Sequence, residues 1–318
     1  MRIRALLLVR TQLGNQVCPR LSPLGCDKLA NRAYHENEGL LAMTFPSDLE
    51  RMETIYKYMW STRSAELLAR LDQSLCPRSP SMLYDVAAEL GVNAGSRILD
   101  AGCGMGAQAC GLAARYGCAV IGLDLAETNL KLARARTRKE GLSDLVTYQQ
   151  GDIQDMPFHD AVFDLVWCRD MLVHVHRLRK AFAECARVLK PNGAMIVHTI
   201  FATGLLEPNE AAWLYEALDI VPENMSPAYF EETCTGAGLQ VHSREEIGSE
   251  WLEYAEEQQG GCSQEMLHIA RMRRGRASLV ADFGQTAYDV MLAVHHWNVY
   301  LMLEKLSSTV YTLRKVTR

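Results

Sequence analysis

A glycine-rich loop and one acidic residue carry the clearest chemical signal in the sequence. The segment RILDAGCGMG leads from an apolar run into glycines at every second position: Gly102, Gly104 and Gly106. A second apolar run ends on Asp124. Glycine permits positive φ and close approach of a ligand to the backbone, and a carboxylate can accept hydrogen bonds from ribose hydroxyls. This pair of segments predicts a site for a nucleoside with a charged tail.

Alternating strands and helices must position that loop. Short apolar runs predict strands at 97–100, 119–124, 146–150, 163–168 and 194–201. Between them, helical patterns occupy 107–117, 126–140 and 174–189. This alternation predicts an α/β protein with a parallel sheet and helices on both faces, whose ligands bind at the carboxyl ends of the strands.

The segments outside this alternation are mostly helical. Helices are expected at 207–219 and 227–236, strands at 239–246 and 309–315, and a long helical stretch at 249–306. We predict an N-terminal extension over 1–45, expected to be poorly ordered, and one catalytic domain over 46–318. In that domain, 46–90 and 249–306 form a helical cap over the strand ends.

Composition narrows the class of protein. The chain has 318 residues and a formal net charge of −5, which argues against electrostatic capture of nucleic acid. It has ten cysteines and no Cys-x-x-Cys pair, so we expect buried thiols in a reducing, cytoplasmic compartment and no metal site. No apolar run is long enough to predict a transmembrane helix.

The first 26 residues allow two interpretations. They contain four arginines and no acidic residue around an ALLLV segment, which would suit an organelle transit peptide. Alternatively, they belong to an extension upstream of Met43, which is then the natural start. The second interpretation is favoured because the apolar run is short.

The stretch from about Arg97 to Phe201 resembles the class I S-adenosylmethionine (SAM)-dependent methyltransferases. It is most similar to the small-molecule group that includes ubiquinone/menaquinone C-methyltransferases and sarcosine/dimethylglycine N-methyltransferases. The resemblance is carried by LDAGCGMG, GLDLAE, GDIQDMPF, FDLVWCRDMLVHV and RVLKPNGAMIV. It implies a Rossmann-like, seven-stranded, mostly parallel sheet. It also implies methyl transfer from SAM to the N, O or C atom of a small organic acceptor, in specialised or natural-product metabolism.

The resemblance also implies roles for individual residues. Asp100, Gly102, Gly104 and Gly106 would line the methionine moiety of SAM. Asp124 would bind the ribose, and Leu125, Asp152 and Ile153 would surround the adenine. Cys168 would lie where the fourth strand passes the sulfonium.

Residues just after that strand are candidates for a general base: Asp170, His174 and His176. His174 and Asp170 are four residues apart and could share one helix face. A base is needed only if the acceptor must lose a proton during methyl transfer. His174 could equally cap or pack against the sheet edge, and His198 is expected to be a packed core histidine.

Aromatic residues in the cap segments could bind the acceptor. The candidates are Tyr56, Trp60, Trp251 and Trp297, together with His174. Aromatic faces can hold a flat ring or a cationic amine, although most such residues are needed simply to pack helices.

Other functions remain open at this stage. A protein or RNA methyltransferase would share the core, and a non-catalytic SAM-binding relative would be expected to have a degraded loop. An NAD-dependent oxidoreductase would need G-x-G-x-x-G, and here the third glycine comes one residue early. The sequence leaves the acceptor and the oligomeric state open, with a homodimer among the alternatives.

Overall fold

The computed structural model describes residues 48–316. These residues fall into two compact units, and the boundary along the chain lies between Gln73 and Ser74. The predictions made for the N-terminal extension 1–45, including a transit peptide and an alternative start, lie outside the described residues. We describe each unit by itself.

The first unit contributes two helices, as expected from the sequence. These are α2 (Asp48–Met59) and α3 (Thr62–Leu71). Ser61 caps α3, because its hydroxyl accepts a hydrogen bond of 3.1 Å from the backbone of Ser64. The membership of this unit in the helical cap stays a prediction.

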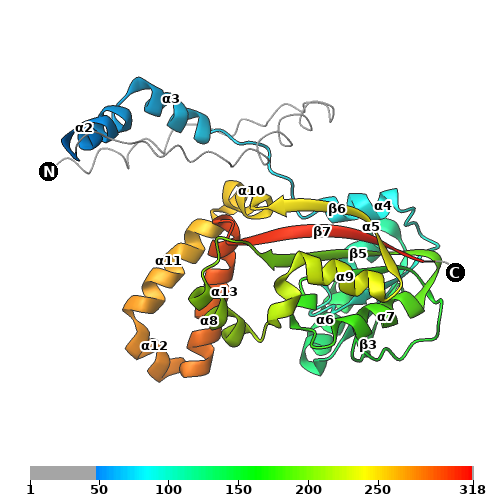
Figure 1. The fold of residues 1–318 in the computed structure, drawn as a ribbon. Coiled ribbons are helices and arrows are strands. Elements are labelled where there is room, and N and C mark those ends of the chain that lie inside the picture. Colours follow the sequence, from blue (N-terminus) through cyan, green and yellow to red (C-terminus); the bar gives the residue numbers. More distant parts are fainter. Residues whose placement is uncertain (1–47, 317–318) are drawn as a thin grey trace. The chain divides into compact units, whose positions relative to one another are not determined.

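The second unit is built on a seven-stranded sheet in the order β3-β2-β1-β4-β5-β7-β6 (Figure 1). β1 to β5 are parallel, and β7 is antiparallel to both of its neighbours. The strands are β1 (Arg97–Ala101), β2 (Ala119–Asp124), β3 (Val146–Gln150), β4 (Phe163–Arg169), β5 (Leu189–Ala202), β6 (Leu239–Gly248) and β7 (Leu306–Lys315). The predicted Rossmann-like, mostly parallel sheet is therefore confirmed.

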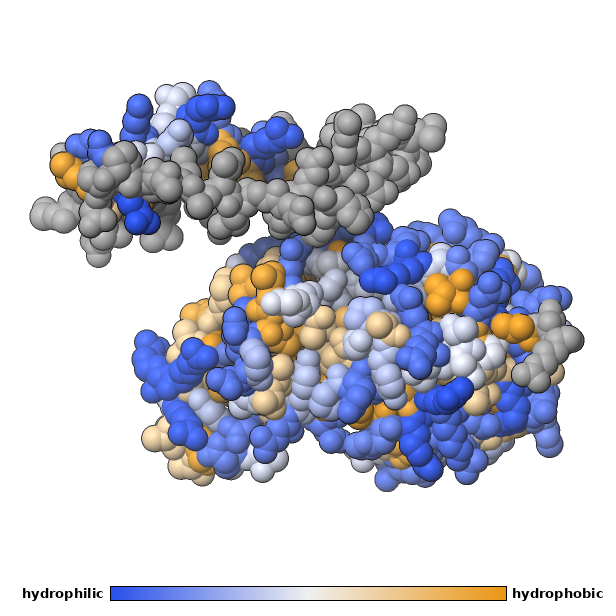
Figure 2. All heavy atoms as spheres, viewed as in Figure 1, coloured by the Kyte–Doolittle hydropathy of each residue, from blue (hydrophilic) through white to orange (hydrophobic). Residues whose placement is uncertain are grey.

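Helices cover both faces of this sheet. The helices that precede β1 or connect the strands of the sheet include α4 (Met82–Glu89), α5 (Ala107–Tyr116), α6 (Glu127–Lys139), α7 (Leu178–Val188) and α9 (Pro227–Gly236). One apolar cluster joins α7 and α9 to the sheet, and another joins α4 and α5 to the opposite face. Hydrophilic residues dominate the visible surface of this unit (Figure 2).

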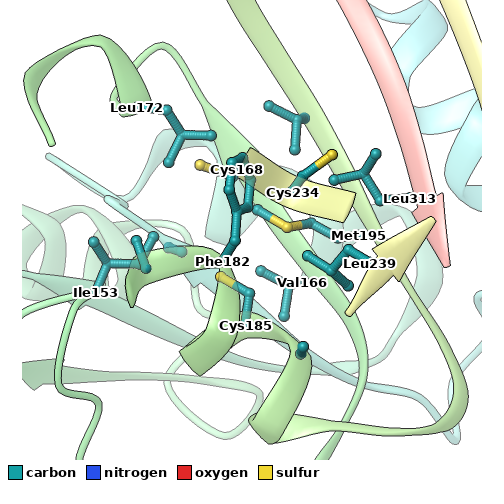
Figure 3. Packing of buried hydrophobic residues seen from close by; sticks show 14 of the residues in the cluster. Ile153, Val166, Cys168, Leu172, Phe182, Cys185, Met195, Cys234, Leu239 and Leu313 are labelled. Carbon is teal, nitrogen blue, oxygen red and sulfur yellow. The ribbon is translucent and has the colours of Figure 1, made fainter. Parts of the chain in front are cut away.

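The two clusters follow the two-residue period of the strands. Along β4, Val166 and Cys168 belong to the cluster against α7, whereas Leu165 and Trp167 belong to the cluster against α4 and α5. Figure 3 shows Cys168 among the side chains on the α7 side, near Phe182. The two faces of β4 thus pack against different helices.

The remaining helices occupy the stretch 249–306 in four pieces rather than one, and their role as a cap over the strand ends stays a prediction. They are α10 (Glu250–Gln259), α11 (Gly261–Arg274), α12 (Arg276–Phe283) and α13 (Gln285–Met302), with α8 (Pro208–Leu218) packed against α13. Figure 1 shows α11 and α13 side by side. No helix among residues 48–316 is long and apolar enough to span a membrane.

One predicted helix differs from the structure. The expected helix 174–189 is replaced by a short 3-10 helix, η1 (Leu172–His174), and by α7, which begins at Leu178. Asp170, with φ of 58°, stands before η1 in the left-handed region. The chain therefore turns sharply at the end of β4 instead of entering a helix directly.

Candidate active site

The glycine loop leaves β1 and turns into α5. The backbone N–H groups of Gly102 and Cys103 donate to the Leu123 carbonyl at the end of β2, at 2.8 and 3.0 Å. Gly102, Gly104 and Gly106 all have positive φ, which side chains other than glycine rarely adopt. The loop is thereby held across the carboxyl ends of both strands.

The three glycines differ in what surrounds them. A Cβ on Gly102 would collide with Met171, and one on Gly106 would collide with the Tyr148 hydroxyl. A Cβ on Gly104 would meet no heavy atom of the described residues within 4 Å. Gly104 therefore presents bare backbone to open space, which is what a ligand approaching the loop requires.

Asp124 ties the loop to β2. Its Oδ2 accepts from the Gly104 N–H at 2.8 Å, and its Oδ1 accepts from the Ala126 N–H at 2.9 Å and from Asn129 at 3.2 Å. An ionised carboxylate offers about four acceptor positions, so one remains free. A ribose diol that takes two positions would displace one of these donors, and the longest contact belongs to Asn129.

The neighbouring apolar residues differ in exposure. Leu125 at the end of β2 is 64% exposed and Met105 in the loop is 53% exposed, which is high for large apolar side chains. Ile153 is buried, and Asp152 shapes its turn by accepting from the Gln154 N–H at 2.8 Å. Leu125, next to Asp124, thus leaves apolar surface where the sequence predicts the adenine.

Asp100 is buried at the end of β1, with 2% of its surface exposed. Its Oδ2 has no hydrogen-bond partner among the described residues. Burial raises the pKa of Asp100 to about 7, against a lowering by a backbone hydrogen bond from Ala109. A buried carboxyl oxygen without a partner suits a cationic ligand, and SAM carries both an ammonium group and a sulfonium. The residues present therefore fit SAM.

Strand register places a second group of polar side chains on the same face as Asp100. Asp100 pairs with Trp167, and Arg169, two residues further, pairs with His198 on β5. Paired residues in a parallel sheet point to the same side, so these four side chains share a face. Buried side-chain atoms without a hydrogen-bond partner in the described chain all belong to this region: Asp100 Oδ2, Trp167 Nε1, His198 Nδ1 and Nε2, and Trp251 Nε1.

His198 and Asp170 form an acid–base pair at this edge. His198 is buried, and its Nδ1 lies 2.6 Å from Asp170 Oδ1, an ion-pair distance without hydrogen-bond geometry. Asp170 also accepts from the Arg169 guanidinium at 3.0 Å. Burial raises the pKa of Asp170, but His198 and Arg169 outweigh it, so the pKa lies below its ordinary value. Nε2 is the ring nitrogen of His198 that does not face Asp170, and it has no hydrogen-bond partner in the described chain.

Trp251 on α10 covers this pair. Its ring stacks on His198 with centroids 4.3 Å apart, and the Arg169 guanidinium lies 5.4 Å from its ring centroid. The predicted acceptor residue Trp251 is thus brought to the end of β4, as part of the cap. The sequence analysis interpreted His198 only as a packed core residue and missed this pair, because residues 170, 198 and 251 meet only through the sheet register and the cap.

The structure separates other residues that the sequence grouped together. His174 is exposed, and its Nδ1 contacts the Asp219 carbonyl at 3.0 Å. The expected helix face shared by Asp170 and His174 is wrong, because Asp170 precedes η1 with left-handed backbone. Trp297 packs in the apolar cluster of α8 and α13. Tyr56 and Trp60 lie exposed in the other unit.

Cys168 lies on the opposite face from Asp100. It pairs with Ala101 and Val197, and its thiol is buried among apolar residues that pack against α7. Burial raises the pKa of this thiol well above its ordinary value, so it stays protonated. At the cofactor edge, Cys168 can offer its backbone but not its thiol.

Two surface hollows lie away from this edge. One follows the turn between α12 and α13, from Phe283 to Met291. The other lies at the amino ends of β1 and β4, where Asp164 and Lys190 form an ion pair of 2.8 Å. Neither hollow is lined by a residue of the glycine loop. The features that fit a cofactor are therefore the glycine loop and the unpaired polar atoms, and not either hollow.

Comparisons with known proteins agree with this geometry. Residues 99–197 match a family described as a methyltransferase domain. The chain is 30% identical over 205 residues to a glycine/sarcosine/dimethylglycine N-methyltransferase from Actinopolyspora halophila, covering 64% of this chain and 36% of that protein. It is 35% identical over 174 residues to methyltransferase GfsG from Streptomyces halstedii, covering 55% and 58%. The chain therefore spans less than two thirds of either relative.

A solved structure shares the fold. It is a phosphoethanolamine N-methyltransferase 2 from Haemonchus contortus, with 21% identity and a TM-score of 0.57, covering 77% of this chain and 54% of that one. Sheet order, glycine loop and matched residues agree with one another: residues 99–197 form a methyltransferase domain of the SAM-dependent class. SAM is the cofactor of this class.

Proposed function

We propose that this protein transfers a methyl group from SAM to a small organic acceptor bound at the ends of β4 and β5. The observation that carries the proposal is the shared face of Asp100 and His198. At one end of this face, beside an open glycine loop, a buried carboxyl group has one oxygen without a partner in the described chain. At the other end, a buried histidine is paired with an acid.

The cofactor would be held by backbone and carboxylates. Gly104 offers open backbone, Asp100 meets the positive charge of the methionine end, and Asp124 accepts from the ribose. Leu125 and the turn at Asp152 and Ile153 would bound the adenine. SAM, when bound, supplies an electrophilic methyl group on a sulfonium. The sulfur leaves as a neutral thioether, so the leaving group needs no acid.

His198 is the group we propose as general base. Neighbouring strands are about 4.8 Å apart, and His198 lies two residues beyond the register partner of Asp100 on β5, so the two residues are separated by roughly 12 Å. A methyl donor anchored at Asp100 could thus present its reactive end toward β4 and β5. Asp170 orients the imidazole and stabilises its protonated form, while Nε2 takes a proton from the acceptor. The sequence named His174 and Asp170 as the candidate bases. In this proposal Asp170 positions His198, and His174 is not the base.

The acceptor would meet an aromatic surface. Trp251 and Trp167 both contribute indole N–H groups that lack partners in the described chain, which suits an acceptor with its own oxygen or carboxylate. The alignment of the acceptor with the methyl group and the exclusion of water by the cap would provide most of the rate enhancement.

Methyl incorporation tests the proposal. The full-length protein is incubated with SAM labelled in its methyl group and with a panel of small amines, phenols and carboxylic acids. We expect label in at least one small product, and loss of that product in Asp124→Ala. The exposed Asp144→Ala is the matched control and should keep the activity. Label that enters only protein or RNA would overturn the small-molecule assignment.

The setting of this activity is also proposed. We infer a role in specialised metabolism, which the resemblance to small-molecule methyltransferases implies, and a cytoplasmic location, supported by eight free cysteines among the described residues. A homodimer is a further proposal, which light scattering on the purified protein would test.

A further inference from the structure

Three side chains with metal-binding chemistry converge between α11 and α13. Glu265 and His268 are three residues apart on α11, so they project from the same side of that helix. His295 reaches them from α13. One ligand atom from each residue can be chosen so that all three atoms lie within 4.8 Å of one another.

The contacts in this cluster already connect the two helices. His295 Nδ1 contacts Glu265 Oε2, and the rings of His268 and His295 have centroids 4.8 Å apart. His268 forms no hydrogen bond within the described residues, although it is half-buried. A pairing of Glu265 with His295 accounts for two of the three residues and leaves His268 unexplained.

A fourth residue supports the carboxylate. Asn298, one turn beyond His295 on α13, donates to Glu265 Oε1 at 3.1 Å. Outer hydrogen bonds of this kind orient the ligands of metal sites. The side chains of His295 and Glu265 are 13% and 25% exposed, so the cluster is sheltered but open to an ion from solution.

We propose that Glu265, His268 and His295 bind one divalent transition metal ion, with Zn²⁺ as the best match. Two imidazoles and one carboxylate suit zinc, cobalt or iron rather than magnesium or calcium. Zinc bonds of about 2.0–2.1 Å place tetrahedral ligand atoms about 3.4 Å apart, so side-chain adjustments of roughly 1 Å would close the site. A water molecule would take the fourth position. The ion would clamp α11 to α13 in the helical cap, independently of methyl transfer.

Cobalt(II) provides a direct probe of this site. The full-length protein is stripped with a chelator and titrated with Co²⁺, whose visible absorption reports its coordination. We expect one equivalent to bind with the strong d–d bands of a four-coordinate site, and Zn²⁺ to displace it. A near-ultraviolet thiolate charge-transfer band would instead assign the ion to cysteines and overturn the proposal.

Single substitutions separate a metal site from a simple hydrogen bond. His268→Ala leaves the contact between Glu265 and His295 intact, so it should weaken Co²⁺ binding at least tenfold and abolish the rise in melting temperature caused by Zn²⁺. The exposed His242→Ala on β6 is the matched control and should behave as wild type. Equal affinity in wild type and His268→Ala would overturn the proposal. If His268→Ala fails to fold, Glu265→Gln replaces it, because the amide keeps hydrogen-bonding capacity but loses the ligand charge.

Discussion

The nucleotide side and the acceptor side of this sheet edge are built in different ways. At β1 and β2 the site consists mainly of backbone, shaped by three glycines within five residues and joined to Asp124 by a hydrogen bond from Gly104. At β4 and β5 it consists of side chains, and Asp170, His198 and Trp251 come from distant parts of the sequence. A backbone site can serve any relative that uses the same cofactor, whereas a side-chain site can be changed for a new acceptor.

The largest effect is expected from removal of His198, which should impair the acceptor side and leave the nucleotide side intact. His198→Ala should lower kcat by about 10²–10⁴-fold, because a positioned general base contributes that much, while the Kd for SAM changes little. Steady-state kinetics with the acceptor found in the labelling screen, together with calorimetry, would measure both. His242→Ala, at an exposed histidine on β6, serves as the control. Full activity in His198→Ala would show that alignment alone drives catalysis and that the acceptor side holds no base.

Two glycine substitutions sharpen the account of the nucleotide side. Gly106→Ala should destabilise the fold by about 1–3 kcal/mol, because its Cβ would collide with the Tyr148 hydroxyl at a left-handed position. Gly104→Ala should disturb the fold less, since its Cβ faces open space, yet weaken SAM binding about tenfold or more. Urea unfolding and calorimetry on each variant would compare them. If Gly104→Ala binds SAM as wild type does, the open side of the loop does not face the cofactor.

The pH dependence of SAM binding tests Asp100. Because its pKa is raised from 3.8 to about 7, the affinity for the cationic cofactor should rise with pH and level off above about pH 7. The stability of the ligand-free protein should change in the opposite direction. The folded state binds more protons than the unfolded state between these two pKa values, so this contribution to stability falls as pH rises from about 4 to 7.

Asp100→Asn should remove both trends and bind SAM more weakly at pH 8. Calorimetric titrations and urea melts at several pH values provide the measurement. A wild-type affinity that does not change between about pH 5.5 and pH 8 would contradict a role for Asp100 at the cofactor.

The smallest effect is expected for the Cys168 thiol, which is buried on the face of the sheet opposite Asp100. Cys168→Ala should cost about 1 kcal/mol of stability through lost packing and leave the Kd for SAM within about twofold of wild type. The buried Cys185→Ala on α7 is a matched control in the same cluster. A selective loss of SAM affinity in Cys168→Ala would mean that the thiol, and not only the backbone, contacts the cofactor.

The sequence predicted the strands and the glycine loop of the nucleotide side because their signals are local. The strands that end at Ala101 and Asp124 and the left-handed glycines follow from short patterns. The sequence did not predict the contacts among Asp170, His198 and Trp251. The helix expected at 174–189 hid the sharp turn at Asp170, and only strand register brings His198 beside it. The division of 249–306 into four helices depends on Gly260, Gly275 and Gly284, whose effect on a long helical pattern is ambiguous from sequence alone.

Calorimetric titration of the purified protein with SAM, S-adenosylhomocysteine and NADH tests the central claim most directly. We expect both adenosyl compounds to bind one site with micromolar or tighter Kd, binding to weaken at least 100-fold in Asp124→Ala, and NADH to show no heat of binding. Tight binding of NADH without binding of SAM would contradict the claim that the open glycine loop and Asp124 hold an adenosyl sulfonium.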